Sequence, residues 1–347
     1  MRIAVVGHFG FGKQLVNGQT IKTKILAEAL QARFGADAVS LIDSSAGLKA
    51  VPKLALDIFR AFCRCDNIIM LPAHNGVKFF APLFAIYNFF FRRGTHYVVI
   101  GGWLPEYLDK YKWLRVFLRA FSAIYVETNT ACQALTDRGL SNAIVMPNFK
   151  RLAILREDEL CHNSQFPLRL CTFSTVMREK GIEDAIDAVT AVNERSGFAA
   201  YSLDIYGPIY EDYRADFNAR MRGAPSYIEY KGVVAASESV DVLKNYYALV
   251  FPTRFFTEGV PGTIIDAYAS GLPVICSRWA SYADIVDEGV TGAAYDFEDI
   301  DALIALLEHF KASPHVLDLM KVNCLDRARA YMPEQAIDCL ISRMVKL

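Results

Sequence analysis

The chain has 347 residues, of which 53% are hydrophobic and 22% charged, and its formal net charge is −1. This length and apolar content suit two domains with separate cores, and the near-neutral charge argues against a general nucleic-acid-binding protein. The eight cysteines form no CxxC pair and no zinc-type spacing with histidine, so we expect free thiols in a reducing compartment and no metal site.

Short apolar runs alternate with helical patterns through the first half of the chain, which enters a strand at once, so we expect no signal peptide. The runs are continuous, as is typical of a parallel sheet covered on both faces. We therefore predict a doubly wound α/β domain over residues 1–150. The expected strands are 2–6, 38–42, 67–71, 96–100, 123–127 and 143–146, with helices that include 21–34 and 107–121.

The segment 77–93, VKFFAPLFAIYNFFFRR, is unusually apolar. Its longest apolar block of about 13 residues is short of the roughly 20 needed to span a bilayer. One interpretation is a buried helix that packs on the sheet. The other is a helix that lies in the membrane interface, with Lys78, Arg92 and Arg93 near anionic lipid. The second interpretation would place a cytoplasmic protein peripherally on the inner face of the membrane.

The second half of the chain repeats the same alternation. The segment 147–167 is charged in its middle and has proline near both ends, which predicts an interdomain linker. We predict a second Rossmann-like domain over 151–332, and two such domains imply a cleft faced by the carboxyl ends of both sheets. The expected strands are 168–173, 201–207, 227–232, 248–252 and 273–277, followed by helical patterns at 300–311, 315–328 and 334–346.

The loop after the first strand, VVGHFGFGKQ (5–14), nearly matches a phosphate-binding loop, but the Ser or Thr expected after Lys13 is Gln14. An Asn-Gly turn follows, and Thr20 is the expected N-cap of the first helix, which we therefore expect to begin too late for an ATPase loop. Two interpretations remain. The loop is a plain tight turn, or Gly18 lets a diphosphate approach the backbone N–H groups of the helix N-terminus.

The segment 251–277, FPTRFFTEGVPGTIIDAYASGLPVICS, carries the strongest functional signal. It predicts a strand, a loop with Glu258, a short helix from about Thr263 to Ser270, and a second strand. An anionic diphosphate fits the helix N-terminus, and the carboxylates of Glu258 and Asp266 are suited to accept hydrogen bonds from sugar and ribose hydroxyls. This pattern indicates a site for a nucleotide diphosphate sugar. The alternative is that both residues are ordinary loop and helix acids.

The same segment resembles the donor-site signature of retaining glycosyltransferases of the GT-B fold, family four. That signature has two acids separated by seven residues around Gly-x-Pro, and then a Gly-x-Pro-Val strand. The resemblance implies two Rossmann-like domains that face a central cleft, and metal-independent sugar transfer without a further cofactor. The second acid is Asp here rather than the usual Glu. The matching donor-binding positions are Glu258, Gly259, Val260, Pro261, Asp266 and the strand that begins at Gly271, with the N–H groups of Gly262 and Thr263 at the leaving diphosphate.

A second match is FSTVMREKGIEDAIDAV (173–189), which is similar to the family's strand and loop with Lys-Gly opening a helix. The resemblance implies that Lys180 neutralises the leaving diphosphate. The family usually has an Arg about five positions earlier, where this chain has Thr175. We expect Thr175 in the donor site and Arg178 as the substitute cation.

Two further segments resemble the family. VMPNFKR (145–151) resembles the strand end that closes the family's N-terminal domain. ARAYMPEQAIDCLISRM (328–344) resembles its last helix, so we expect a C-terminal helix at about 333–347 to pack back on the first domain.

Acceptor-binding residues are expected in the loops at the strand ends of the first domain, because polar and aromatic groups suit the hydroxyls and the C–H face of a sugar. A structural role is the alternative for each of them. A glycan or a lipid-linked oligosaccharide is the expected acceptor, in a bacterial surface polysaccharide pathway. The candidates are His8, Phe9, His74, Asn75, Gly102 and Trp103.

Other hypotheses have weaker support. The string at 299–301, Asp-Ile-Asp, matches a metal-binding motif of other transferases but precedes a helical pattern, so we expect a helix cap. A non-catalytic GT-B-like subunit that binds a partner enzyme or a glycan is an alternative, given Thr175 and Asp266. A nicotinamide-dependent oxidoreductase is a further alternative, although GHFGFG departs from G-x-G-x-x-G and Asp43 is its only ribose-binding candidate.

Overall fold

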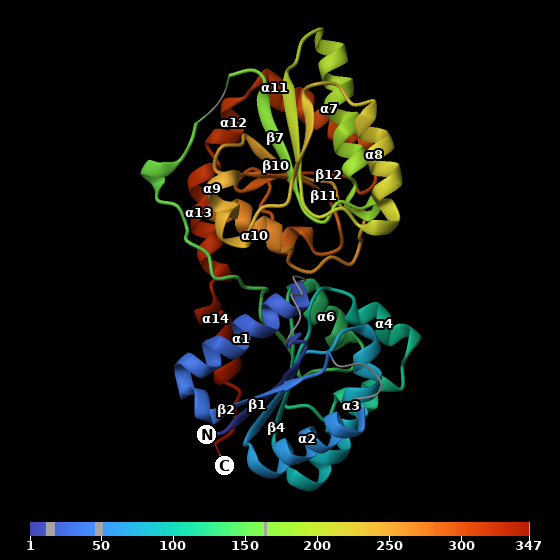
Figure 1. Ribbon diagram of the computed structural model, residues 1–347, viewed down its shortest axis with the longest axis vertical. Coiled ribbons are helices and arrows are strands. Elements are labelled where there is room, and N and C mark those ends of the chain that lie inside the picture. Colours follow the sequence, from blue (N-terminus) through green and yellow to red (C-terminus); the bar gives the residue numbers. More distant parts are fainter. Residues whose placement is uncertain (12–17, 46–50, 163–164, 347) are drawn as a thin grey trace. The chain divides into compact units, whose positions relative to one another are not determined.

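The computed structural model describes residues 1–11, 18–45, 51–162 and 165–346, and it divides into two compact units (Figure 1). Unit 1 comprises Met1–Arg151 and Tyr331–Leu347, and unit 2 comprises Leu152–Ala330. Each unit has a six-stranded sheet whose strands are all parallel. Helices flank both sheets, and the predicted α/β fold class is confirmed.

The sheet of unit 1 has the order β2-β1-β3-β4-β5-β6. Its order reverses between β1 and β3, where Ile3 pairs with both Val39 and Asn67. The observed strands lie within two residues of those predicted. They are β1 (Ile3–Gly7), β2 (Val39–Asp43), β3 (Asn67–Met70), β4 (Gly94–Val98), β5 (Ala123–Val126) and β6 (Ala143–Val145).

Two predicted helices of unit 1 differ from those observed. The first begins at Gly18, so Thr20 lies in its first turn and is not its N-cap. The stretch 107–121 is not one helix, because Tyr111 leaves the helical region with φ −121° and ψ 61°. The helices are α1 (Gly18–Phe34), α2 (Val51–Arg64), α3 (His74–Phe91), α4 (Leu104–Lys110), α5 (Leu114–Leu118), α6 (Asn129–Asp137) and α14 (Pro333–Ile341).

Both faces of this sheet are covered, which explains its continuous apolar strands. Ile3 and Val5 of β1 point to one face and pack with α1 and α14, whereas Ala4 and Val6 point to the other and pack with α2 and α3. Figure 1 shows α14, in red, beside α1, in blue. The C-terminal segment therefore completes the core of unit 1.

A chain of buried polar groups holds this C-terminal segment in place. Asn67 donates from Nδ2 to the carbonyl of Val345 (2.8 Å) and accepts at Oδ1 from the Val345 N–H (3.0 Å). His96 Nε2 contacts the same Oδ1 (3.1 Å), and its Nδ1 contacts the Tyr125 hydroxyl (3.2 Å). Burial lowers the pKa of His96 to about 4, so the imidazole is neutral near pH 7.

Unit 2 has the strand order β12-β11-β10-β7-β8-β9, which is the Rossmann order. β12 was not among the predicted strands, because its sequence GAAY has no apolar run. The strands are β7 (Leu168–Phe173), β8 (Tyr201–Tyr206), β9 (Ile228–Gly232), β10 (Ala248–Phe251), β11 (Val274–Ser277) and β12 (Gly292–Tyr295). The helices are α7 (Ile182–Ser196), α8 (Arg214–Arg222), α9 (Ser239–Leu243), α10 (Gly262–Ala269), α11 (Ile300–Ala312), α12 (His315–Asp318) and α13 (Lys321–Ala328).

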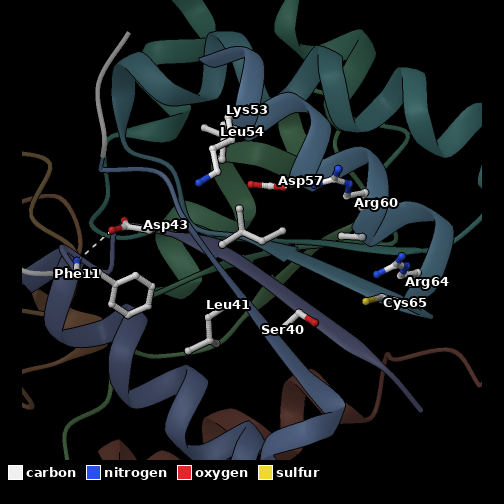
Figure 2. A pocket seen from close by; sticks show the side chains of 12 residues that line it. Phe11, Ser40, Leu41, Asp43, Lys53, Leu54, Asp57, Arg60, Arg64 and Cys65 are labelled. Atoms are coloured by element: carbon white, nitrogen blue, oxygen red, sulfur yellow. Dashed lines mark hydrogen bonds and ion pairs between the residues drawn. The ribbon is translucent and has the colours of Figure 1, made fainter. Parts of the chain in front are cut away.

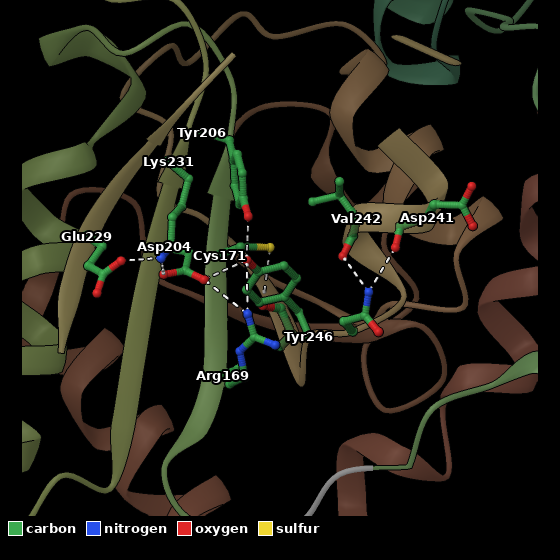
Figure 3. A network of polar contacts seen from close by, with 11 residues as sticks. Arg169, Cys171, Asp204, Tyr206, Glu229, Lys231, Asp241, Val242 and Tyr246 are labelled. Carbon is green, nitrogen blue, oxygen red and sulfur yellow. Dashed lines mark hydrogen bonds and ion pairs between the residues drawn. The ribbon is translucent and has the colours of Figure 1, made fainter. Parts of the chain in front are cut away.

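A polar network joins the central strands of unit 2 (Figure 3). The Tyr246 hydroxyl, just ahead of β10, donates to Asp204 of β8 (2.6 Å), and Arg169 of β7 contacts the same oxygen (3.2 Å). The Tyr206 and Tyr246 hydroxyls lie 2.7 Å apart. Burial raises the pKa of Tyr246, so its hydroxyl keeps its proton. These contacts hold the entry of β10 against β7 and β8.

Candidate functional site

The strand order of unit 2 reverses between β7 and β10, and the loops that leave these two strands contact each other. Lys180 lies in the loop after β7 and Glu258 in the loop after β10. The Arg254 N–H donates to the Glu179 carbonyl (2.8 Å), which ties the two loops together. Ligands of open α/β sheets bind at such a reversal, outside the carboxyl ends of the strands.

Gly181 makes this close approach of the two loops possible. It has φ +66°, and a Cβ there would lie 1.8 Å from the Pro252 carbonyl oxygen. Only glycine combines this left-handed backbone with so short a contact. Lys180 immediately precedes Gly181, so its position at the end of β10 follows from the glycine.

Lys180 and Glu258 form an ion pair between the two loops, and both side chains are mostly but not fully buried. The Thr253 hydroxyl donates to Glu258 Oε1 (3.3 Å), which orients the carboxylate. Lys180 Nζ lies 5.5 Å and 5.0 Å from the ring centroids of Phe251 and Phe255. The lysine thus has aromatic faces beside it and one carboxylate as counter-ion.

The N-terminus of α10 adjoins the Glu258 loop and offers hydrogen-bond donors. Its N-cap, Pro261, provides no side-chain cap, and the N–H groups of Gly262 and Thr263 have no acceptor among the described residues. The Thr263 hydroxyl is buried and likewise has no partner in the described part of the chain. A buried hydroxyl without a partner is rare in folded proteins. Together with the helix dipole, these donors form a site suited to an anion.

Side chains that the sequence analysis did not single out fix the Glu258 loop. The Ser281 hydroxyl donates to the Glu258 carbonyl (3.2 Å), and the Ser277 hydroxyl donates to the Thr253 carbonyl (2.6 Å). The Ala280 N–H donates to the Phe256 carbonyl (3.0 Å). The sequence did offer one signal for the role of Thr253 in orienting Glu258, because Thr253 follows the end of strand β10 closely. The loop is therefore held from β11 and from the segment after it.

Arg178 does not take the place of the missing arginine. Its guanidinium donates to Asp216 of α8 (2.8 Å) and lies 5.5 Å from the ring centroid of Tyr213. It therefore contacts α8, and this pairing departs from the expected role of a helper cation. Thr175 is half-buried in the same loop.

Asp266 also departs from the expected role. It is buried on α10, and the Ser239 hydroxyl at the start of α9 lies 3.3 Å from its Oδ1. The carboxylate faces the protein and not solvent, so it does not present itself to a ribose in this structure. Gly259, Val260 and Pro261 are buried too. The side chains of Val260 and Pro261 shape the loop, and Gly262 and Thr263 are half-buried.

The glycine-rich loop of unit 1 lies partly outside the described residues, because Lys13, Gln14 and the Asn-Gly turn fall in or beside 12–17. Gly18 is exposed at the start of α1, with open space where a side chain would stand. Asp43 accepts hydrogen bonds from the N–H groups of Phe9 (3.0 Å) and Phe11 (3.0 Å), and from Ser45. Burial alone would raise the pKa of Asp43, but these hydrogen bonds outweigh it and the pKa is lowered. Asp43 therefore organises this loop and is not available to a ribose.

The six acceptor candidates differ in their structural surroundings. His74 begins α3 and stacks on Trp103, with ring centroids 4.0 Å apart, and burial lowers the pKa of His74. The Trp103 indole donates to the Ile100 carbonyl (2.8 Å). Exposed Asn75 and half-buried Gly102 flank this stacked pair in sequence.

The two candidates after β1 do not join that pair. His8 Nδ1 contacts the Thr20 hydroxyl (2.9 Å), which orients the ring. Phe9 is buried in the core of unit 1 and stacks on Phe11, so its side chain cannot contact an acceptor as expected. The stacked pair of His74 and Trp103 is therefore the best-formed aromatic surface among the six candidates.

A cavity of about 530 Å³ in unit 1 is lined mainly by β2 and α2 (Figure 2). Figure 2 shows Lys53, Asp57, Arg60 and Arg64 along α2 at its rim. None of the predicted donor or acceptor residues lines it. Among the described residues, no group of three or more His, Cys, Asp or Glu side chains is arranged to hold a metal ion.

Comparisons with known proteins show which proteins this chain is similar to. Residues 167–310 match the family model of glycosyl transferases group 1. The amylovoran biosynthesis glycosyltransferase AmsK of Erwinia amylovora is 25% identical over 173 residues, which is 47% of this chain and 40% of that protein. The match thus spans well under half of that relative's length.

Solved structures show the same fold over nearly the whole chain. HepE of Anabaena, in complex with UDP-glucose, has a TM-score of 0.74 at 13% identity and covers 99% of this chain and 98% of its own. Sucrose-phosphate synthase of Thermosynechococcus elongatus has a TM-score of 0.75 at 15% identity and covers 99% and 97%.

The two Rossmann-like units define a two-domain α/β protein of the GT-B fold. Within it, residues 167–310 of unit 2 match the glycosyl transferases of group 1, and this match supports the resemblance recognised from the Glu258 and Lys180 segments. The matched range contains Lys180, Glu258 and the start of α10.

Proposed function

We propose that the protein is a glycosyltransferase whose donor is a nucleotide diphosphate sugar. The observation that carries the proposal is the Lys180–Glu258 pair at the strand-order reversal, beside an α10 N-terminus whose Thr263 hydroxyl has no partner among the residues that the structure describes. A diphosphate would satisfy these donors and the lysine at once. The UDP-glucose complex of HepE supports a UDP-sugar as the first donor to test.

In the proposed reaction, Lys180 leaves Glu258 and neutralises the diphosphate as negative charge grows on it. The N–H groups of Gly262 and Thr263 stabilise the same charge, because they already point out of the helix N-terminus. Glu258, released from the lysine but still oriented by Thr253, accepts hydrogen bonds from the sugar. Catalysis then rests on positioning and charge stabilisation. As the sequence resemblance implies, we propose retention of the anomeric configuration, with no metal ion or other cofactor.

We propose a glycan or a lipid-linked oligosaccharide as acceptor, in bacterial surface polysaccharide synthesis. The relative named for amylovoran biosynthesis supports such a pathway. The stacked rings of His74 and Trp103 offer a flat surface to the C–H face of a sugar. A lipid-linked acceptor would bring the protein to the cytoplasmic face of the membrane.

The decisive experiment measures nucleotide diphosphate release from UDP-, GDP-, ADP- and dTDP-sugars. We expect slow release from one donor, and Lys180→Ala and Glu258→Ala should each lower it by about 100-fold or more. Arg178→Ala is the matched control, because this cation lies in the same loop but binds Asp216, and it should retain release.

Two results would overturn the proposal. One is equal release by all three variants and the unchanged chain. The other is nucleotide binding without turnover even when lipid-linked acceptors are supplied, which would favour a non-catalytic GT-B-like subunit.

A further inference from the structure

Helices α3 and α5 of unit 1 expose a group of large apolar side chains. Phe89 and Phe90 at the end of α3 are 78% and 73% exposed, and Val116 of α5 is 65% exposed. The opposite face of α3 already packs in the core through residues such as Phe80 and Phe84. The exposed rings therefore contribute little to the fold, and an apolar surface of this kind marks an interaction site. We call it the α3–α5 patch; its members are Ile86, Phe89, Phe90, Trp113, Val116 and Phe117.

The two helices form one continuous surface. A shallow groove of about 240 Å³ is lined by Ile86, Phe89 and Phe90 from α3 and by Phe117 from α5. The Phe117 ring lies 5.9 Å from the ring of Trp113, measured between centroids. The groove thus joins the end of α3 to Phe117 of α5, whose ring contacts the indole of Trp113.

Cations outnumber acids around the patch, and the nearby carboxylate of Asp109 is paired with Arg115 (2.8 Å) and Arg138 (2.6 Å). Residues 74–93 contain three Lys or Arg and 110–122 contain four, and neither range contains Asp or Glu, although the whole chain carries a net charge of −1. Arg92 follows the exposed phenylalanines and Lys112 precedes Trp113. The side chains of Arg92 and Lys112 have no ion pair or hydrogen bond with any described residue. They are available to an external anion.

We infer that the α3–α5 patch docks on the surface of a membrane that contains anionic lipids. The aromatic and aliphatic side chains would enter the interface while Arg92 and Lys112 meet lipid head groups. A second copy of the chain fits less well, because it would bring the same cations against one another. No helix in the described ranges is both long and apolar enough to cross a bilayer. The inference is independent of sugar transfer.

The test is sedimentation of the full chain with phosphatidylcholine vesicles, with and without phosphatidylglycerol. We expect binding only when phosphatidylglycerol is present, and weaker binding as salt is raised. The double variant F89A/F90A should weaken it by about tenfold or more, because two apolar rings leave the interface. The double variant R92E/K112E should also weaken it by about tenfold or more, because two attractive charges become repulsive.

Unit 2 offers matched controls. Phe166 and Phe198 are an exposed edge-to-face pair with ring centroids 5.4 Å apart, close to the 5.3 Å of Phe89 and Phe90. The variants F166A/F198A and R195E/R222E should bind vesicles as the unchanged chain does. Circular dichroism should show that all four variants are folded, and donor turnover should be unchanged in F89A/F90A and R92E/K112E.

Three outcomes would overturn the inference. The first is no binding to phosphatidylglycerol vesicles, or equal binding to both kinds. The second is an equal loss of binding in the control variants. The third is self-association, without vesicle binding, that F89A/F90A removes, which would assign the patch to a contact between copies.

Discussion

Each unit of this protein brings one lysine and one glutamate together beyond the strands of its sheet. In unit 1, Lys22 of α1 lies 2.7 Å from Glu127, the residue after β5, and each side chain is 3% exposed. In unit 2, Lys180 and Glu258 come from the loops after β7 and β10, and their side chains are 18% and 15% exposed. The two pairs share residue types and differ in access to solvent.

The surroundings of the two lysines explain why only one pair suits a ligand. Lys22 Nζ also lies 3.5 Å from the Val99 carbonyl and 5.6 Å from the centroid of the Phe149 ring, so protein groups surround it. Lys180 lies in a loop next to an α10 N-terminus with donors that lack partners in the described part of the chain. In the proposed reaction a diphosphate replaces Glu258 at Lys180, whereas Lys22 is buried from solvent. Accessibility and neighbouring groups therefore separate a structural ion pair from the pair that we propose binds the donor.

We expect the largest change in stability when the buried Lys22–Glu127 pair loses one partner. Glu127→Ala leaves Lys22 charged in the core without its carboxylate, and it should lower the free energy of unfolding by about 3–5 kcal/mol. Urea denaturation followed by circular dichroism measures this loss. Glu28→Ala, which removes an exposed carboxylate of α1, is the control and should change stability by about 0.5 kcal/mol or less. If both variants lost the same free energy of unfolding, the Lys22–Glu127 pair would not be a structural ion pair.

The accessible pair should behave in the opposite way. Lys180→Met should lower donor turnover by about 100- to 1,000-fold, because the charge that grows on the diphosphate loses its cation. Its loss of unfolding free energy should be smaller than that of Glu127→Ala, because Glu258 keeps access to water and its contact with Thr253. Nucleotide release and urea denaturation on the same sample measure both. A variant as unstable as Glu127→Ala would show that this pair is structural too.

Unit 1 buries a further titratable group, and this predicts a pH dependence. The pKa of His96 is lowered to about 4 from the ordinary 6.5, so between these values the unfolded chain binds a proton that the folded chain does not. Stability is therefore full above pH 6.5 and falls by about 3 kcal/mol as the pH drops to 4. Calorimetry across this range measures it. His96→Gln, which keeps a donor and an acceptor but does not titrate, should flatten the dependence, and an unchanged slope would contradict the assignment.

The smallest effect concerns the unpartnered hydroxyl of Thr263. Thr263→Val removes a buried polar group without changing the shape of the side chain, so stability should stay equal or rise slightly. Binding of the nucleotide diphosphate should weaken by about tenfold, because one hydrogen bond is lost. Calorimetric titration with UDP measures the affinity. Thr253→Val is the comparison, because that hydroxyl has partners and its loss should lower stability. If Thr263→Val bound UDP with unchanged affinity, the Thr263 hydroxyl would not be part of the donor site.

The sequence predicted most of the fold, because strands covered on both faces are continuous apolar runs between helical patterns. Strand β12 was not predicted, because its sequence GAAY lacks such a run. Asp299 was correctly predicted to cap a helix, since its carboxylate accepts from the Ala302 N–H (2.9 Å).

The site was predicted less completely. The predictions that were wrong concern side chains whose partners lie far apart from them in the sequence. Arg178 is drawn to Asp216, 38 positions away, and Asp266 is covered by Ser239 of another helix. The burial of Lys22 with Glu127, 105 positions away, has no local signal either. The Thr263 hydroxyl has no hydrogen-bond partner among the described residues. This follows from how the chain packs and could not be predicted from the residue type.

The route of the backbone has a consequence for biosynthesis. The chain leaves unit 1 at Arg151 and returns to it at Tyr331, after unit 2 is complete. Unit 2 is contiguous and can fold as soon as it has left the ribosome, but unit 1 must wait for α14, whose Ile337 and Leu340 fill its core beside α1. Until then the apolar face of α1 is uncovered and Asn67 lacks its Val345 partner. The half made first therefore matures last, and it is the half that most needs protection from aggregation on the nascent chain.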